Sequence, residues 1–119
     1  MSDLTLSWGT CKVKYSKDKH WCDLEKLNLD HEIFENLKGV YIIWSHKNVI
    51  RLGSGTIKER LKEHRENPEI TEYPDLKVTW AKVNANQMEG VEKYLADKLK
   101  PLVGERFPNR IPIKVNLPW

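Results

Sequence analysis

The sequence predicts an α+β domain in which helices flank a small, mainly antiparallel, three-stranded sheet. Two observations support this fold class. Apolar runs rich in β-branched and aromatic residues, 39–44 and 49–53, lie on either side of the turn-forming residues 45–48, as in a β-hairpin. A third apolar run at 76–83 lies between two segments with helical periodicity. The predicted order is therefore helix, strand, strand, helix, strand, helix and an extended tail.

The first predicted helix lies just before the hairpin. Asp30 is a suitable N-cap and Gly39 is a typical helix-ending residue. The apolar residues on one side of this helix are Ile33, Phe34 and Leu37. The hairpin follows directly, and we expect Gly53-Ser54-Gly55 to break its second strand.

A capping pattern marks the helix that follows the hairpin. Thr56 and Glu59 have the spacing of a capping box, in which each residue satisfies a free backbone N–H of the first turn. The helix is expected to run to about Asn67. Pro68 and Pro74 then flank a predicted loop.

Prolines also mark the end of the last helix. The third strand is predicted at 76–83, and a longer helix runs from about residue 86 to residue 100. Pro101 stops that helix because proline cannot continue the hydrogen-bonding ladder. The proline-containing tail, 101–119, is expected to run in extended form over the surface of the domain.

The composition is that of one globular domain. At 119 residues, the chain has the length of a single domain and can bury a core without metal or disulfide staples. We expect no membrane span and no secretory signal, because the sequence lacks a long apolar run and its start lacks the basic-then-apolar layout of a signal. Cys11 and Cys22 could form a disulfide, but free thiols and a cytoplasmic location are the simpler interpretation.

The positive charge of the chain is concentrated in one segment. The whole chain has a formal net charge of +3. Residues 47–65 hold six lysines and arginines against two glutamates, a net charge of +4, whereas residues 1–46 have −1 and residues 66–119 are neutral. Such a segment attracts phosphate groups. A solvated helix face has the same composition, and on charge alone it is the preferred interpretation.

Two predicted helices place charged side chains on the side that carries their apolar residues. At 100° per residue, Arg60 and His64 share one stripe with Ile57 and Leu61. Glu92 falls beside the apolar stripe of the later helix. Burying an unpaired charge is costly, so these groups need a partner, an anion or a solvated cleft. A buried Arg60–Glu92 ion pair and side chains that reach solvent from the edge of the stripe are the alternatives to a functional cleft.

Several motifs, in order along the chain, resemble those of the GIY-YIG nuclease superfamily. They are Gly39-Val40-Tyr41 and Arg51-Leu52-Gly53 on the hairpin, Arg60 and His64 on the next helix, Glu92 on the later helix and an asparagine in the tail. The resemblance covers residues 37–119, within a single domain of residues 1–119, and leaves 1–36 as an N-terminal extension packed on this core. It implies a DNA endonuclease that hydrolyses phosphodiester bonds with one divalent ion, Mg²⁺ or Mn²⁺.

The resemblance also implies roles for the matching residues. Glu92 would be the metal ligand, Arg60 would hold the scissile phosphate, and Tyr41 would help to activate the attacking water. His64 could act as a base or proton shuttle, with a packed, hydrogen-bonded histidine as the alternative. The residues expected to contact phosphate or DNA are Arg51, Lys58, Gly53 and Asn116.

Two positions leave alternatives open. Arg51 replaces the second tyrosine of the family motif, and an arginine only donates hydrogen bonds. It could add a phosphate contact or lie on the solvent side of an edge strand. The tail asparagine could be Asn109 instead of Asn116, and either could simply bond to backbone.

The partner and the activity also have alternatives. We expect DNA or another nucleic acid as the partner, no membrane, and a monomer or weak homodimer. Because of the arginine in the family motif, a catalytically impaired nucleic-acid-binding module of the same fold is an alternative to the nuclease. A protein-interaction domain with a tryptophan-rich surface is a further alternative; the chain has five tryptophans.

Overall fold

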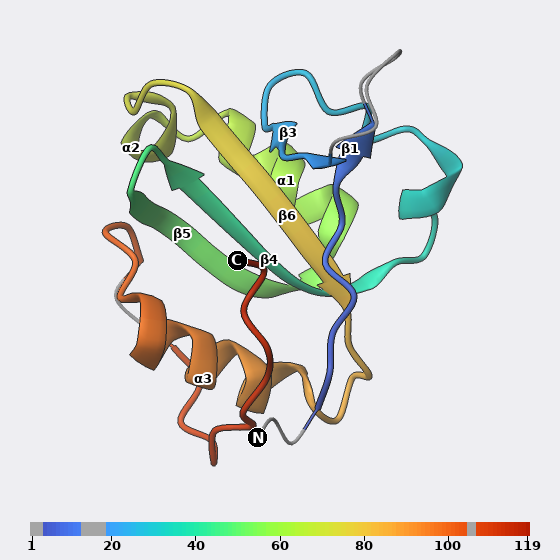
Figure 1. Cartoon of the computed structure of the whole chain (residues 1–119), viewed down its shortest axis with the longest axis vertical. Coiled ribbons are helices and arrows are strands. Elements are labelled where there is room, and N and C mark those ends of the chain that lie inside the picture. The colour runs from blue at the N-terminus through green and yellow to red at the C-terminus, as the bar shows by residue number, and fades with distance from the viewer. Residues whose placement is uncertain (1–3, 13–18, 105–106) are drawn as a thin grey trace.

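The computed structural model describes residues 4–12, 19–104 and 107–119. Over these residues the chain forms an α+β fold with a four-stranded antiparallel sheet and three α-helices (Figure 1). In spatial order, the strands are β3 (Cys22–Asp23), β6 (Leu76–Lys82), β4 (Lys38–Ser45) and β5 (Asn48–Thr56). The predicted class is confirmed, but the sheet has one strand more than the three expected, because β3 joins it from the N-terminal segment.

The predicted hairpin is present as β4 and β5. Tyr41 lies opposite Gly53 and Ile43 lies opposite Arg51. The expected break at residues 53–55 is wrong, because β5 continues to Thr56. Gly39 belongs to β4 and does not end a helix. A side chain at that position would collide with the backbone carbonyl of Ala81 on β6, so glycine allows the two strands to approach.

The three α-helices are α1 (Ile57–Arg65), α2 (Pro68–Thr71) and α3 (Met88–Leu99). Thr56 is the N-cap of α1 as predicted, although its side chain forms no capping bond. A loop was expected where α2 lies, and there the side chain of Asn67 accepts a hydrogen bond from the backbone N–H of Glu69. α3 ends at Lys100, which has the left-handed φ of 47°, immediately before the proline.

The helix expected between residues 30 and 39 is reduced to one 3₁₀ turn, η1 (Glu32–Phe34). His31, and not Asp30, is its N-cap, with Nδ1 accepting from the backbone N–H of Ile33 at 3.1 Å. The Asp30 carboxylate is instead paired with lysines of α1. Of the predicted apolar side, Phe34 is buried, whereas Ile33 is 52% exposed.

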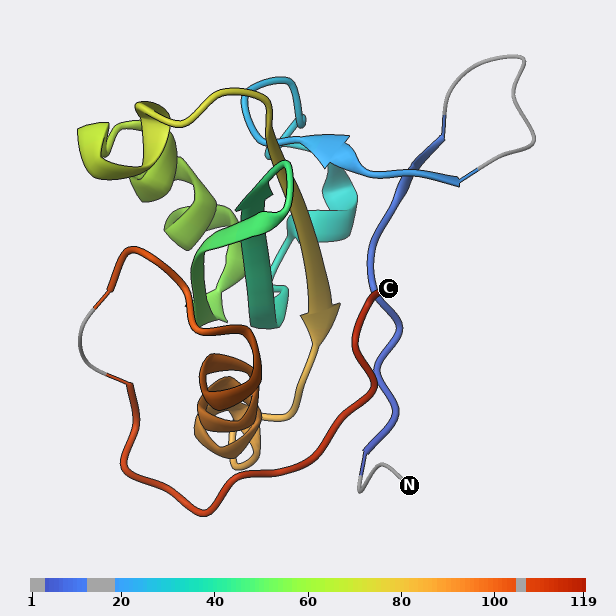
Figure 2. The same cartoon turned by 60° about the vertical axis from the view of Figure 1, so that its left-hand side comes forward.

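Helices cover both faces of the sheet (Figure 2). Alternate residues of β4 point to opposite faces, so Tyr41 and Ile43 pack with Leu61 of α1, whereas Ile42 packs with Val91 of α3. β5 is one of the two edge strands of the sheet, the other being β3, and it contacts both α1 and α3. This edge therefore brings α1, α3 and the hairpin within reach of one another.

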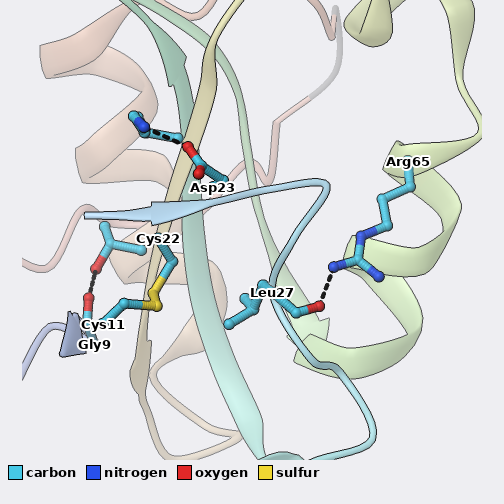
Figure 3. The surroundings of a disulfide bond; sticks show 8 residues. Gly9, Cys11, Cys22, Asp23, Leu27 and Arg65 are labelled. Carbon is cyan, nitrogen blue, oxygen red and sulfur yellow. Dashed lines mark hydrogen bonds and ion pairs between the residues drawn. A yellow bond between two sulfur atoms is a disulfide. The ribbon is translucent and has the colours of Figure 1, made fainter. Parts of the chain in front are cut away.

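The N-terminal segment is linked to the sheet by hydrogen bonds and a disulfide. The strand β1 (Cys11–Lys12) pairs with β2 (Lys19–His20), and β3 pairs with β6. Cys11 and Cys22 form a disulfide, so the prediction of free thiols is wrong (Figure 3). Figure 3 also shows the Arg65 guanidinium of α1 donating to the backbone carbonyl of Leu27.

The tail runs past α3 and returns to lie beside the N-terminal segment (Figures 1 and 2). Ile113 donates its backbone N–H to Gly90 of α3, and Leu4 forms an isolated parallel bridge with Val115. The tail therefore closes over the α3 side of the sheet. Within the described parts of the chain, no helix is both long enough and apolar enough to span a bilayer.

Reducing the disulfide is expected to lower the free energy of unfolding by about 2–3 kcal/mol. The bond closes a loop between residues 11 positions apart, and opening it releases chain entropy in the unfolded state. Urea unfolding with and without dithiothreitol measures the difference. The double variant Cys11→Ala/Cys22→Ala should not respond to the reductant. Equal midpoints for oxidised and fully reduced wild type would contradict the expectation.

Candidate functional site

Two clefts open beside the β5 edge. The larger has a volume of about 760 Å³, and its lining includes Ser54 and Gly55 of β5, Arg60 of α1 and Glu89 of α3. The smaller has a volume of about 600 Å³, and its lining includes Arg51, His64, Asn67 and Gly104. Of the four predicted catalytic residues, Arg60 lines the larger cleft and His64 the smaller one, whereas Tyr41 and Glu92 line neither.

Tyr41 of β4 and His64 of α1 form a buried pair. The Tyr41 Oη to His64 Nε2 distance is 2.6 Å, and the two side chains are 1% and 8% exposed. Burial raises the pKa of Tyr41, and burial followed by the charges of Arg51 and Arg60 lowers the pKa of His64 to about 4. At neutral pH the phenol is therefore protonated and the imidazole is neutral.

Arg51 lies beside this pair. It shares a sheet face with Tyr41, because its cross-strand partner Ile43 is two residues from Tyr41 on β4. A hydrogen bond from Arg51 and its charge both act to lower the pKa of Tyr41, against the larger effect of burial. The neutral imidazole can accept the phenol proton at Nε2 when its own proton is on Nδ1.

Two glycines make room for these side chains. A Cβ at Gly53 would lie 2.5 Å from Tyr41 Oη, so the absence of a side chain lets the hydroxyl lie against β5. Gly104, with φ of 107°, makes room for the Arg51 guanidinium in the same way. Arg51 Nε is buried and, among the described residues, lacks a hydrogen-bond partner. Arg51 is therefore enclosed at the site and does not simply face solvent from an edge strand.

Arg60 is more exposed than its position on the helical stripe predicted. Its side chain is 49% exposed and forms an ion pair with Glu63, one turn along α1, at 3.6 Å. Its stem lies over Gly55, where a Cβ would come within 2.9 Å of Arg60 Nε. The guanidinium still acts electrostatically on Tyr41 and His64. Arg60 is thus a cation available to the larger cleft, and its recorded ion-pair partner is Glu63 instead of Glu92.

Glu92 reaches the same edge from the α3 side. Burial raises the pKa of its carboxyl, and hydrogen bonds from the Ser54 hydroxyl and backbone N–H oppose this shift. The charge of Arg51 also favours the ionised form, whereas Glu89 disfavours it. The carboxylate is therefore held by β5 at a partly dehydrated position.

The surroundings of Glu92 suit a divalent cation. Mg²⁺ is often bound by one or two carboxylates together with water and substrate phosphates. A nearby cation would offset the burial and the Glu89 charge that raise the Glu92 pKa. Within the described ranges no group of three or more histidine, cysteine or acidic side chains forms a complete metal cage. Glu92 therefore offers one carboxylate, and the described residues around it provide no complete set of metal ligands.

Two predicted DNA contacts lie elsewhere. Lys58 pairs with Asp30 at 3.0 Å, so it binds the loop before η1. The Asn116 side chain pairs with Leu6, accepting from its backbone N–H at 2.6 Å and donating to its carbonyl at 3.0 Å. The Asn116 side chain therefore pairs with the backbone of Leu6, as a neighbouring strand would, and links the tail to the N-terminal segment.

The structure adds residues that sequence reasoning did not place at the site. Ser54 holds Glu92, and Glu89 pairs with Arg110 of the tail at 2.6 Å. The spacing of three residues between Glu89 and Glu92 on one helix is a signal that could have identified Glu89. Arg110 and Gly104 lie in the tail, where no periodicity indicates which way a side chain points.

The stability of the domain is expected to fall as the pH decreases from 6.5 towards 4. In this range an unfolded histidine takes up a proton that the buried His64, with its pKa of about 4, does not. The contribution is on the order of 2–3 kcal/mol. Urea unfolding of wild type and His64→Gln across this range isolates it, because other titrating groups are common to both. Parallel pH profiles would contradict the expectation.

Comparison with known proteins adds no family to these observations. No protein-family model, no curated protein and no solved structure matches the chain. Function is therefore inferred from the site itself.

Proposed function

We propose that the chain is a metal-dependent DNA endonuclease of the GIY-YIG type. The observation that carries this proposal is the meeting of one tyrosine–histidine pair, two guanidinium groups and one carboxylate at the open edge of the sheet. These are Tyr41, His64, Arg51, Arg60 and Glu92. They come from two strands and two helices, so the fold alone does not require their convergence.

The guanidinium groups supply phosphate contacts. Arg60 is half-exposed at the larger cleft, and Arg51 lines the smaller one. A guanidinium suits this role because it is permanently charged and can donate two parallel hydrogen bonds to one phosphate. Charge that develops on the phosphate during hydrolysis would be stabilised by the same groups.

The tyrosine–histidine pair supplies a path for one proton. Tyr41 Oη takes a proton from the attacking water while its own proton passes to His64 Nε2. The water oxygen forms a new bond to phosphorus, and the ester oxygen leaves with the bonding pair. His64 is a weak base in the free protein because burial, followed by the charges of Arg51 and Arg60, lowers its pKa to about 4. A bound phosphate neutralises those charges and raises the basicity of His64.

Glu92 would hold the divalent cation. When bound, the cation supplies positive charge that stabilises the leaving oxygen. Ser54 fixes the carboxylate through its hydroxyl and backbone N–H. The Glu89–Arg110 ion pair lines the larger cleft together with Ser54, so the second carboxylate of α3 already has a cationic partner.

A nucleic-acid-binding module without turnover is the second candidate. Tyr41 is 1% exposed, which restricts the access of water to its hydroxyl. Arg51 also acts on both Tyr41 and Glu92, so its charge lies near the place where a cation would bind. These two features favour phosphate binding over hydrolysis.

A plasmid-nicking assay with Mg²⁺ or Mn²⁺ separates the two candidates. Cleavage that requires the ion and stops with EDTA would support the nuclease. Uncleaved DNA that binds with an affinity falling steeply as salt increases would support the binding module. The absence of both cleavage and salt-dependent binding would overturn both candidates.

A further inference from the structure

Three tryptophans form a separate cluster on the α3 side of the sheet, at the hairpin end of β4. Trp44 of β4 lies with its ring centroid 5.3 Å from that of Trp21 and 5.2 Å from that of Trp119. The ring planes meet at 85° and 65°, and Trp21 and Trp119 meet at 88°. The rings therefore meet edge to face, as in a corner, and are not stacked in parallel.

This corner encloses an open pocket. Its volume is about 390 Å³, within the range of roughly 300–1,000 Å³ that is usual for small-ligand sites. Trp119 remains 56% exposed although it touches both other rings. The pocket therefore leaves flat apolar surface accessible to a ligand.

The rim of the pocket determines which ligands fit. His46 and Lys47 of the hairpin turn line it, and none of its described lining residues has an acidic side chain. An aromatic corner with a lysine at its rim and no acidic side chain in its described lining disfavours a cationic guest such as a methylated lysine. It suits a flat, neutral ring attached to an anionic group.

We propose that this tryptophan pocket binds a base of single-stranded nucleic acid, with an adjacent phosphate at Lys47. Base stacking on aromatic side chains combined with a nearby cation is the usual means of binding a single strand without sequence preference. The choice of nucleic acid as ligand rests on the proposed nuclease function. The pocket itself is distinct from the proposed active site.

One strand can reach both places. Trp44 pairs with Val49 of β5, and Ser54, which holds Glu92, is five positions further along that strand. At about 3.4 Å per residue, this separation is roughly 17 Å. That is about five nucleotides at the spacing of stacked bases. The pocket would therefore hold a flanking base while the backbone lies across the β5 edge.

Tryptophan fluorescence quenching by a short oligothymidylate, in EDTA, tests the pocket without cleavage. Trp119→Ala should weaken binding about tenfold, the effect of losing one stacked base. Lys47→Glu should weaken it and reduce its salt dependence. Ile33→Ala is the matched control, because Ile33 is similarly exposed and lies on η1. It should bind like wild type.

Equal affinity of wild type and Trp119→Ala would overturn the proposal. Tighter binding of a neutral oligosaccharide or a proline-rich peptide than of the oligothymidylate would also overturn it. The outcome is distinguishable from failure of the nuclease proposal. If the wild-type protein fails to nick DNA but Trp119→Ala still binds the oligothymidylate more weakly, the pocket proposal is supported and the nuclease proposal is rejected. If the wild-type protein nicks DNA but Trp119→Ala binds as wild type does, only the pocket proposal is rejected.

Discussion

Replacing Glu92 with glutamine is expected to abolish metal-dependent DNA cleavage and to leave the fold intact. Glutamine keeps the shape of the side chain but removes the negative charge that would hold the cation. We expect cleavage to fall by more than ~10³-fold, beyond the effect of losing one electrostatic donor. Plasmid nicking with Mg²⁺ and thermal unfolding of the same preparations measure the two effects.

The stability of Glu92→Gln has a definite expected sign. The folded-state pKa of Glu92 is raised, mainly by burial, so its ionised form opposes folding at neutral pH. A neutral amide removes this opposition, and its oxygen can still accept hydrogen bonds from Ser54. The midpoint of thermal unfolding should therefore be unchanged or higher at pH 7. Loss of activity with a lower midpoint would instead indicate that Glu92 is structural.

Asp97→Asn is the matched control for this variant. Asp97 lies on the same helix, is exposed and pairs with Lys93 at 3.0 Å. It should cleave DNA at the wild-type rate. If Glu92→Gln also retained wild-type cleavage, the assignment of Glu92 as the metal ligand would be wrong, whatever the origin of the nuclease activity.

The hairpin and α3 could be predicted because local signals and burial agree there. The apolar runs of the hairpin correspond to β4 and β5, and Pro101 follows the end of α3 as expected. Helical periodicity also identified His64, which is buried against Tyr41. Where a charged residue falls on an apolar stripe, the conflict itself is the signal that indicates a candidate site.

The remaining features depend on contacts between distant segments. β3 has only two residues and is defined by its pairing with β6. It is therefore too short for a run of apolar residues to predict it. The disulfide depends on how the N-terminal strands are placed, and spacing alone could not distinguish it from free thiols. The contacts of Lys58 and Asn116 could not be predicted, because their partners Asp30 and Leu6 are remote in sequence.

Arg60 illustrates the limit of helical angles. Its angle places it on the apolar stripe, but its long side chain extends over Gly55 and leaves the guanidinium half-exposed. A helical wheel describes where Cβ points and says little about where a flexible terminal group ends. Gly55, which leaves room for this side chain, lies on β5 and not on α1. The contact between Gly55 and Arg60 can therefore be recognised only in the folded structure.

Replacing Arg60 with alanine is expected to reduce cleavage by ~10²–10³-fold with little change in stability. The lost guanidinium removes a donor to the phosphate. Its ion pair with Glu63 is exposed, and such pairs contribute at most about 1 kcal/mol. Lys58→Ala, two residues away in the basic segment but paired with Asp30, is the matched control and should retain cleavage. A large fall in the unfolding midpoint of Arg60→Ala would identify Arg60 as a structural residue.

A second measurement on Arg60→Ala does not depend on turnover. The charge of Arg60 is one cause of the low pKa of His64, so the alanine variant should titrate His64 at a higher pH than wild type. Proton chemical shifts of the imidazole ring report this change directly. Lys58 is not among the groups that shift His64, so Lys58→Ala should leave its titration unchanged. If the pKa of His64 were the same in Arg60→Ala as in wild type, Arg60 would not act on the tyrosine–histidine pair. The proposed site would then contain one guanidinium group instead of two.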